Sequence, residues 1–295
     1  MAGPTGAGKS AFAVALAQRL GGEIIGADAF QVYRGIPVLT SQPGEDERGG
    51  VPHHLVGFLD PAERFDAGRF VREARRLVVE IQARGKVPLV VGGTGLYLKA
   101  LVEGLDEMPE PDEALRAEIS VMPLSQAVEE LQRLDPAGAE AVDLKNPARV
   151  RRALELVRQA GRPLAEVRCG RPGGGMECAG VCLVREREEL RERIAANVEA
   201  MLAGGAVDEV RQISGKPCGG AARAIGFREI GEFLAGRLTI DECRESITTA
   251  TRRYAKRQLT WCRTQLNFQS IVLNGPHTPG SALDAALRLA GRACA

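Results

Sequence analysis

The stretch that decides the fold is Gly3-Pro4-Thr5-Gly6-Ala7-Gly8-Lys9-Ser10. Its spacing is that of a phosphate-binding loop, in which glycines let successive backbone N–H groups converge on phosphate oxygens at a helix N-terminus. Lys9 is expected to reach the terminal phosphates, and Ser10 to bind Mg²⁺ as the cofactor. An apolar, alanine-rich run over residues 12–16 continues as the helix that such a loop opens. The stretch therefore predicts a site for a phosphate-bearing ligand.

A phosphate-binding loop normally follows a central strand, but only Met1 and Ala2 precede Gly3. We expect the first core strand, an apolar run of about five residues, to be missing here and to be encoded upstream of Met1. Its loss removes ladder partners from two flanking strands and several buried side chains, each contributing about 1.5–3 kcal/mol. A chain extended by this run is expected to be more stable and more active.

Apolar runs that read as strands alternate with helical patterns in the first third of the chain. Residues 23–26 form a short buried run that ends before Asp28, and residues 86–91 form the next. Between them, a helix of about 20 residues is predicted over residues 65–84, because apolar side chains recur there at helical spacing. This alternation favours an α/β fold with a parallel sheet.

The pattern changes after Glu103, where prolines mark a break and helical segments follow over residues 113–168. Residues 180–184 resemble a returning strand, and helices are predicted over residues 188–202 and 241–265. We predict a P-loop NTPase-like core interrupted by an all-helical insertion. The boundaries are 1–108 for the first part of the core, 109–179 for the insertion, and 180–295 for the second part with C-terminal helices.

Composition limits the function classes. The chain has 295 residues, 44% of them hydrophobic, and shows neither an apolar run of about 18 residues nor an export signal, so we expect a cytoplasmic protein without a membrane partner. Its seven cysteines show no paired metal-ligand spacing and are expected to be reduced thiols. His53 and His54 lack a third ligand at metal spacing and are expected to be loop residues.

The formal net charge of +1 means that any nucleic-acid site must be local. Two segments are rich in arginine and lysine, residues 149–171 and residues 252–263. Charge alone leaves two interpretations open, a solvated helix face and a phosphate-backbone site.

Two observations bear on the chemistry. A P-loop NTPase would place an Asp after an apolar strand, but the strand over residues 87–91 ends in Gly92-Gly93-Thr94. Nucleotide hydrolysis is therefore less favoured than a reaction in which a diphosphate leaves. Asp28 follows the other strand and can be read either as a general base or as a loop cap.

Several segments occur in the order seen in tRNA dimethylallyltransferases, which the chain resembles over nearly its whole length. They are residues 3–10, Asp28-Ala29-Phe30-Gln31-Val32-Tyr33-Arg34-Gly35, Pro52-His53-His54, residues 91–97, 146–155, 223–228 and 251–261. Ala29, Gln42 and Pro147 depart from residues frequent in relatives, so no side-chain role is carried onto them.

The resemblance implies transfer of a dimethylallyl group from dimethylallyl diphosphate to N6 of the adenosine 3′ of the tRNA anticodon. It implies Asp28 as general base, with Thr94 and Arg223 near the diphosphate and the reacting centre, and residues 3–10 as the phosphate loop. It also implies a helical insertion that binds the anticodon stem-loop. The residues expected to contact tRNA are Asp28, Ala29, Phe30, Gln31, Arg116, Ala148, Arg149, Val150, Arg151, Arg152, Arg223, Ala224, Ile225, Gly226, Phe227 and Arg228.

Three other functions remain open at the level of sequence. A small-molecule or nucleotide kinase shares the loop and the Asp, and an adenylate isopentenyltransferase keeps the prenyl transfer with a free nucleotide as acceptor. A phosphate-loop RNA-binding module without turnover is the third. The arginine-rich insertion favours tRNA as acceptor over a free nucleotide. We also expect the enzyme to act as a monomer.

Overall fold

The computed structural model describes residues 1–105, 109, 112–167, 174–273 and 279–293. It divides into two compact units, one formed by Met1–Val102 with Glu177–Ala295 and the other by Glu103–Met176. The first unit is α/β with parallel strands, which confirms the expected fold class at that level. The expected division at residue 108 falls on a residue outside the described ranges, and the second unit's last residue, Met176, lies close to the expected end at 179.

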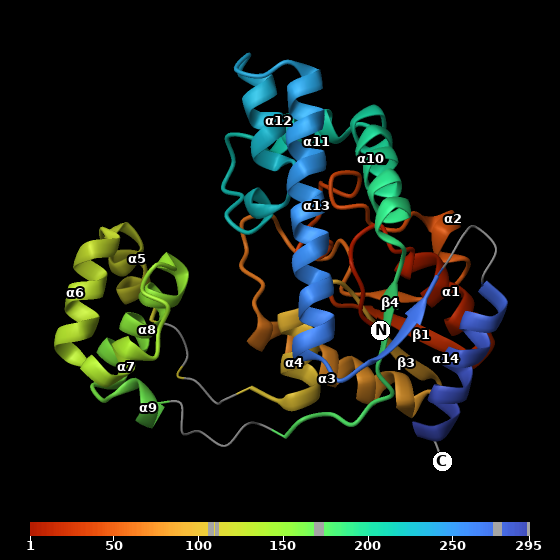
Figure 1. The fold of residues 1–295 in the computed structure, drawn as a ribbon, viewed down its shortest axis with the longest axis horizontal. Coiled ribbons are helices and arrows are strands. Elements are labelled where there is room, and N and C mark those ends of the chain that lie inside the picture. The colour runs from red at the N-terminus through yellow and green to blue at the C-terminus, as the bar shows by residue number, and fades with distance from the viewer. Residues whose placement is uncertain (106–108, 110–111, 168–173, 274–278, 294–295) are drawn as a thin grey trace. The chain divides into compact units, whose positions relative to one another are not determined.

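The first unit contains the strands and most of the helices (Figure 1). Its strands are β1 (Gly22–Gly26), β2 (His53–His54), β3 (Val87–Val91), β4 (Val181–Val184) and β5 (Gln269–Val272). Its helices are α1 (Lys9–Leu20), α2 (Glu45–Arg48), α3 (Ala67–Ala83), α4 (Gly95–Glu103), α10 (Arg187–Ala203), α11 (Ala206–Ile213), the short 3₁₀ helix η1 (Ala221–Arg223), α12 (Phe227–Leu234), α13 (Ile240–Gln265) and α14 (Pro279–Ala293).

The strands form two parallel groups, with orders β2-β1-β3 and β4-β5. Ala2 lies between the groups and makes single parallel bridges to Gly92, after β3, and to Cys182 in β4. Its N–H donates to the Val181 carbonyl at 2.7 Å, and its carbonyl accepts from Leu183 N–H at 2.9 Å. Residues Met1 and Ala2 thus lie where the strand before the phosphate loop was expected.

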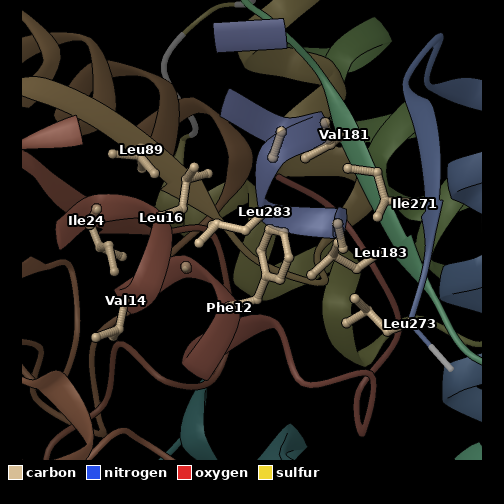
Figure 2. Packing of buried hydrophobic residues seen from close by; sticks show 14 of the residues in the cluster. Phe12, Val14, Leu16, Ile24, Leu89, Val181, Leu183, Ile271, Leu273 and Leu283 are labelled. Carbon is tan, nitrogen blue, oxygen red and sulfur yellow. The ribbon is translucent and has the colours of Figure 1, made fainter. Parts of the chain in front are cut away.

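The core of this unit is centred on helix α1. Phe12 of α1 packs among Leu183 of β4, Ile271 of β5 and Leu283 of α14, and all four are buried (Figure 2). Each such side chain contributes about 1.5–3 kcal/mol when buried. These contacts fix the first turn of α1, and with it the phosphate loop, relative to both groups of strands.

Helix α3 shows why its sequence is helical. Asp66 caps the first turn by accepting from Arg69 N–H at 2.9 Å. The expected apolar stripe, Phe70, Ala74, Leu77 and Ile81, is buried as predicted and faces the core. The predicted strands at residues 23–26, 86–91 and 180–184 are confirmed as β1, β3 and β4.

The second unit consists of α5 (Glu113–Val121), α6 (Leu124–Leu134), α7 (Pro136–Glu140), α8 (Pro147–Ala160) and α9 (Leu164–Val167). Its own core includes Ile119, Leu131 and Leu154. The start of α8 explains the unusual Pro147, which occupies the first helical turn while the Asn146 side chain accepts from Ala148 and Arg149 N–H. Proline costs no hydrogen bond at that position.

Replacing Gly92 by Ala is expected to destabilise the first unit. A Cβ there would lie 2.0 Å from the Ala27 carbonyl oxygen and 2.3 Å from its carbon, and backbone atoms cannot move aside without disturbing β1. We expect a loss of about 3 kcal/mol or more in the free energy of unfolding, measured by urea denaturation.

The matched control is Gly231→Ala in helix α12, where no atom lies within 4 Å of the new Cβ. Alanine is favoured over glycine inside a helix by about 1 kcal/mol, so this variant should unfold at equal or higher urea concentration. Equal stability of the Gly92→Ala variant and the wild type would show that the β1–β3 edge tolerates displacement.

Candidate active site

A cavity of about 540 Å³ lies in the first unit. Its wall is formed by the phosphate loop, by the segment after β1, by residues 38–43, and by one face each of α10 and α13. Thr5, Gly6, Gly8, Lys9 and Ser10 of the phosphate loop line it, while Gly3, Pro4 and Ala7 are buried behind them. The loop therefore presents its C-terminal half and the start of α1 to the cavity.

The backbone of the loop adopts a conformation that favours glycine. Gly6 and Gly8 have φ angles of 79° and 90°, and Gly8 is the N-cap residue of α1. Within the described residues, the N–H groups of Gly8, Lys9 and Ser10 have no protein acceptor. These donors and the positive end of the α1 dipole favour an anion at this position.

Lys9 folds back onto the loop, where its Nζ donates to the Pro4 carbonyl at 2.9 Å. Burial lowers the pKa of its ammonium group, and the nearby charge of Asp28 opposes that shift. The ammonium group therefore lies in the cavity wall close enough to Asp28 for the two charges to interact.

Asp28 caps the loop after β1 and also faces the cavity. Its Oδ1 accepts from Phe30 N–H at 2.9 Å and from Gln31 N–H at 3.2 Å, which is the geometry of a loop cap. The residue also lines the cavity, together with Phe30 and Gln31. Within the described part of the chain, Oδ2 has no protein donor, so one carboxylate oxygen is held and the other can accept a proton.

Thr94 lies behind this segment, outside the set of cavity-lining residues. Its Oγ1 accepts from Ala29 N–H at 3.0 Å, and its own N–H donates to the Ala27 carbonyl at 3.2 Å. These two bonds hold the backbone on both sides of Asp28. In this conformation Thr94 positions the carboxylate through the backbone.

One face of α13 completes the cavity, where Thr251, Tyr254 and Gln258 follow one another at helical spacing. Burial raises the pKa of the Tyr254 hydroxyl to about 12, the Asp28 charge adds to the shift, and polar contacts with Thr94 and Gln258 oppose it. The hydroxyl therefore remains protonated at neutral pH and can donate a hydrogen bond.

Gln258 was given no role from the sequence, yet it joins two glycine-rich segments. Its Oε1 accepts from Thr5 N–H at 2.8 Å, and its Nε2 donates to the Gly93 carbonyl at 2.9 Å. The side chain is buried and hydrogen-bonded through both its oxygen and its nitrogen, which fixes the phosphate loop relative to the turn after β3. The available signal was its place on the same helical face as Thr251 and Tyr254.

Two arginines also contact the loop, and neither was identified from the sequence. Arg185 Nε donates to the Ala7 carbonyl at 2.8 Å, and Arg193 Nε donates to the Gly6 carbonyl at 2.9 Å. Arg185 is half-buried and ion-paired with Glu189, whereas Arg193 is exposed and lines the cavity.

The expected site segment at residues 223–228 lies partly on the cavity. Ala224 and Ile225 line it, whereas Arg223 is exposed and does not. Gly226 has a φ of 98° and begins α12, in which the exposed Arg228 pairs with Glu229 at 2.8 Å. Phe227 is half-buried.

The two histidines form strand β2, so the expectation that they are loop residues was wrong, and His53 also lines the cavity. His53 Nδ1 contacts the Val51 carbonyl oxygen at 2.8 Å, and His54 contacts Glu23 at 2.7 Å, a carboxylate that also pairs with Arg84. Over the described residues, no group of three or more His, Cys, Asp or Glu could hold a metal ion.

Five cysteines are free thiols in the described residues, namely Cys178, Cys182, Cys218, Cys243 and Cys262. Cys169 and Cys294 lie outside the described residues.

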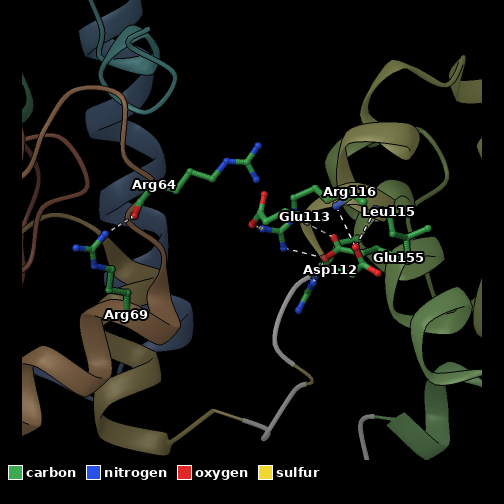
Figure 3. A network of polar contacts seen from close by, with 9 residues as sticks. Arg64, Arg69, Asp112, Glu113, Leu115, Arg116 and Glu155 are labelled. Carbon is green, nitrogen blue, oxygen red and sulfur yellow. Dashed lines mark hydrogen bonds and ion pairs between the residues drawn. The ribbon is translucent and has the colours of Figure 1, made fainter.

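In the helical unit, the buried carboxylate of Glu155 pairs with two of the arginines expected to contact tRNA, and Figure 3 shows it beside one of them, Arg116. Glu155 Oε1 pairs with Arg116 at 2.8 Å and with Arg152 at 2.6 Å. Arg151 donates to the Met122 carbonyl at 3.1 Å. Arg149, at the start of α8 beside Ala148, is exposed, and Val150 is buried in the core. Of the expected arginine cluster, Arg168 and Arg171 lie outside the described residues.

Basic side chains also cover the solvent-exposed part of α13. Arg252, Arg253, Lys256, Arg257 and Arg263 are all exposed there. None of the helices in the described ranges has the length and hydrophobicity needed to span a bilayer.

Two family models and several known proteins match this chain. The model of the family described as IPP transferase matches residues 31–265, and that described as Isopentenyl transferase matches residues 1–54. The tRNA dimethylallyltransferase of Bordetella parapertussis is 42% identical over 280 residues, which cover 90% of this chain and 89% of that protein.

Two solved structures are similar throughout. One is the tRNA isopentenylpyrophosphate transferase of Bacillus halodurans, with a TM-score of 0.72 and 33% identity over 99% of this chain and 94% of the other. The second is a eukaryotic dimethylallyltransferase described as acting on tRNA, with a TM-score of 0.82 and 29% identity over 97% of this chain and 76% of the other.

Proposed function

Because the chain belongs to the IPP transferase family, we propose that it transfers a dimethylallyl group from dimethylallyl diphosphate to tRNA. The acceptor is N6 of the adenosine immediately 3′ of the anticodon, and diphosphate is released. The observation that carries this proposal is that Asp28 and the phosphate loop face the same cavity. A proton acceptor and a diphosphate site are thereby brought together at one reacting centre.

Asp28 acts as the general base in this proposal. The adenine amino group is a weak nucleophile because its lone pair is delocalised into the ring, so removing a proton as the C–N bond forms lowers the barrier. Oδ1 is held by the N–H groups of Phe30 and Gln31, which orients Oδ2 for the proton. Thr94 fixes the backbone through Ala29, and the base must first leave its stack to enter the cavity.

The phosphate loop stabilises the leaving group. When the C–O bond breaks, negative charge develops on the diphosphate, and the free N–H groups of Gly8, Lys9 and Ser10 are already oriented toward it. Lys9 adds a positive charge, and Arg223, beside the cavity, can add a second when its exposed side chain turns inward. In this proposal the parallel sheet and the loop form a P-loop NTPase-like core that binds the diphosphate as it leaves.

Mg²⁺ fits the donors present at this position. Ser10 offers one hydroxyl on the cavity wall, and Mg²⁺ usually binds one or two protein oxygens together with phosphates and water. Ser10 would therefore hold the ion against the diphosphate, where it supplies charge neutralisation.

The helical unit is proposed to bind the anticodon stem-loop. Phosphate contacts need side chains that are exposed and not neutralised, and Arg149 meets both conditions within the described residues. Arg116 and Arg152 share the buried carboxylate of Glu155, and Arg116 also pairs with Glu113 at 3.2 Å, so these two arginines are held in a fixed orientation. The enzyme acts as a monomer in the cytoplasm, where its tRNA acceptor is found.

Replacing Arg149 by Ala is expected to weaken tRNA binding and to flatten its salt dependence. Each lost phosphate contact removes about one unit or less from the slope of log affinity against log salt. Filter binding at several salt concentrations measures both quantities. Arg158→Ala is the control, because Arg158 pairs with Glu118 at 2.8 Å and should contribute little to tRNA binding. An unchanged salt slope for Arg149→Ala would show that Arg149 is a solvated surface residue without a phosphate contact.

An acceptor competition separates tRNA from free nucleotide. With dimethylallyl diphosphate and Mg²⁺ present, unmodified tRNA and adenosine monophosphate compete, and the prenylated products are counted by mass. The proposal predicts prenylated tRNA as the dominant product. Preferential prenylation of the free nucleotide would make the chain an adenylate isopentenyltransferase instead.

A further inference from the structure

Within the proposed function, and resting on it, we infer that Arg193 is a direct ligand of the diphosphate. Arg193 is on α10, a helix far from the phosphate loop in sequence, and it lines the same cavity as Lys9 and Asp28. The inference adds a binding residue that neither the loop motif nor the segments of the resemblance contain.

The position of the guanidinium is set by the loop itself. Nε donates to the Gly6 carbonyl at 2.9 Å, which leaves the terminal nitrogens and their N–H groups for another acceptor. Nη2 lies 3.8 Å from the place where a Cβ on Gly8 would be. It is thus beside the last glycine of the loop, next to the N–H groups proposed to receive the diphosphate.

Helix α10 packs closely enough on the loop to hold this arrangement. A Cβ on Gly6 would lie 3.2 Å from side-chain carbons of both Leu190 and Ile194, so the helix and the loop are in direct contact. Arg185, which precedes α10, donates to the next carbonyl, that of Ala7. The two arginines therefore bind consecutive carbonyls of the loop.

The two arginines differ in whether a carboxylate neutralises their positive charge. Arg185 is half-buried and its charge is neutralised by Glu189, which makes it a positioning residue for the loop. In the described part of the chain, Arg193 has no ion-pair partner, whereas Arg191 on the same helix pairs with Glu188 at 2.9 Å. An unpaired, cavity-lining guanidinium two residues from a paired one is suited to a diphosphate oxygen, which it can bind through two parallel N–H groups.

The test uses inorganic diphosphate with Mg²⁺ as the probe, measured by calorimetry on the full chain. Arg193→Ala is expected to raise the Kd about 10- to 100-fold, and the KM for dimethylallyl diphosphate similarly, because a charge-assisted hydrogen bond is lost. The Kd for tRNA should stay within about twofold of wild type. Arg191→Ala is the matched control and should change neither value.

Arg193→Gln separates direct binding from loop positioning. Its amide can still donate to the Gly6 carbonyl but carries no charge, so a direct ligand predicts weakened diphosphate binding in this variant too. If either variant, Arg193→Ala or Arg193→Gln, binds diphosphate as tightly as the wild type, the inference is overturned. A loss confined to tRNA binding would also overturn it.

The proposed function fails in a distinguishable way. If the wild type itself binds neither diphosphate nor dimethylallyl diphosphate, the proposed function is wrong and the inference falls with it. If the wild type binds diphosphate and both Arg193 variants bind it equally well, only the inference is wrong.

Discussion

The Asp28→Asn variant is expected to prenylate tRNA about 10²–10⁴-fold more slowly than wild type in a single turnover, while its affinity for tRNA changes little. The amide oxygen of Asn can still accept from the N–H groups of Phe30 and Gln31, so the loop keeps its shape. What it loses is the ability to take the proton from the adenine amino group. Quenched-flow prenylation with enzyme in excess over tRNA measures the effect.

Asp28→Ala serves as the companion variant, because it removes both the proton acceptor and the loop cap. If the cap alone matters, Asn should be nearly as active as wild type and Ala should be impaired. That outcome would exclude Asp28 as the general base. Equal, large losses in both variants support the assignment.

The Lys9→Ala variant is expected to lower kcat about 10²–10³-fold, the range typical of removing one donor that stabilises developing charge. Lys9 lies in the cavity wall at the start of α1 and is proposed to bind the diphosphate as it leaves. The KM for dimethylallyl diphosphate should also rise, and tRNA affinity should not change. Steady-state kinetics and filter binding measure these quantities.

Lys86→Ala is the control for Lys9, since it removes the same charge from an exposed position just before β3. It should behave as wild type. A Lys9 variant with normal kcat and KM but weakened tRNA binding would place the lysine at the acceptor and would contradict its role at the diphosphate.

The elements that the sequence predicted correctly are those whose residues show a recognisable pattern within a short stretch of the chain. The strand at β1 is a continuous buried run, and α3 repeats apolar residues at helical spacing, so each is visible in a short window. Strand β5 was not predicted, because only Ile271 of its residues is buried and the run shows no clear alternation. Its strand character comes from pairing with β4, which a short window does not reveal.

The same distinction between local patterns and distant contacts applies to the site residues. The phosphate loop and Asp28 were found because glycine spacing and a strand-end carboxylate have a local signature. Gln258 and Arg193 were missed because their partners, Thr5 and Gly6, lie far away in sequence, and a Gln or Arg on a helix is usually a surface residue. Only the packing of α10 and α13 around the loop gives these side chains a role.

The most direct test of the central claim incubates the protein with dimethylallyl diphosphate, Mg²⁺ and unmodified tRNA, then digests the tRNA and measures nucleoside masses. We predict N6-dimethylallyl adenosine from a tRNA with adenosine 3′ of the anticodon, and none when guanosine replaces that adenosine. Absence of prenylated nucleoside, together with ATP-dependent phosphorylation of a small molecule by the same preparation, would contradict the account and favour a kinase.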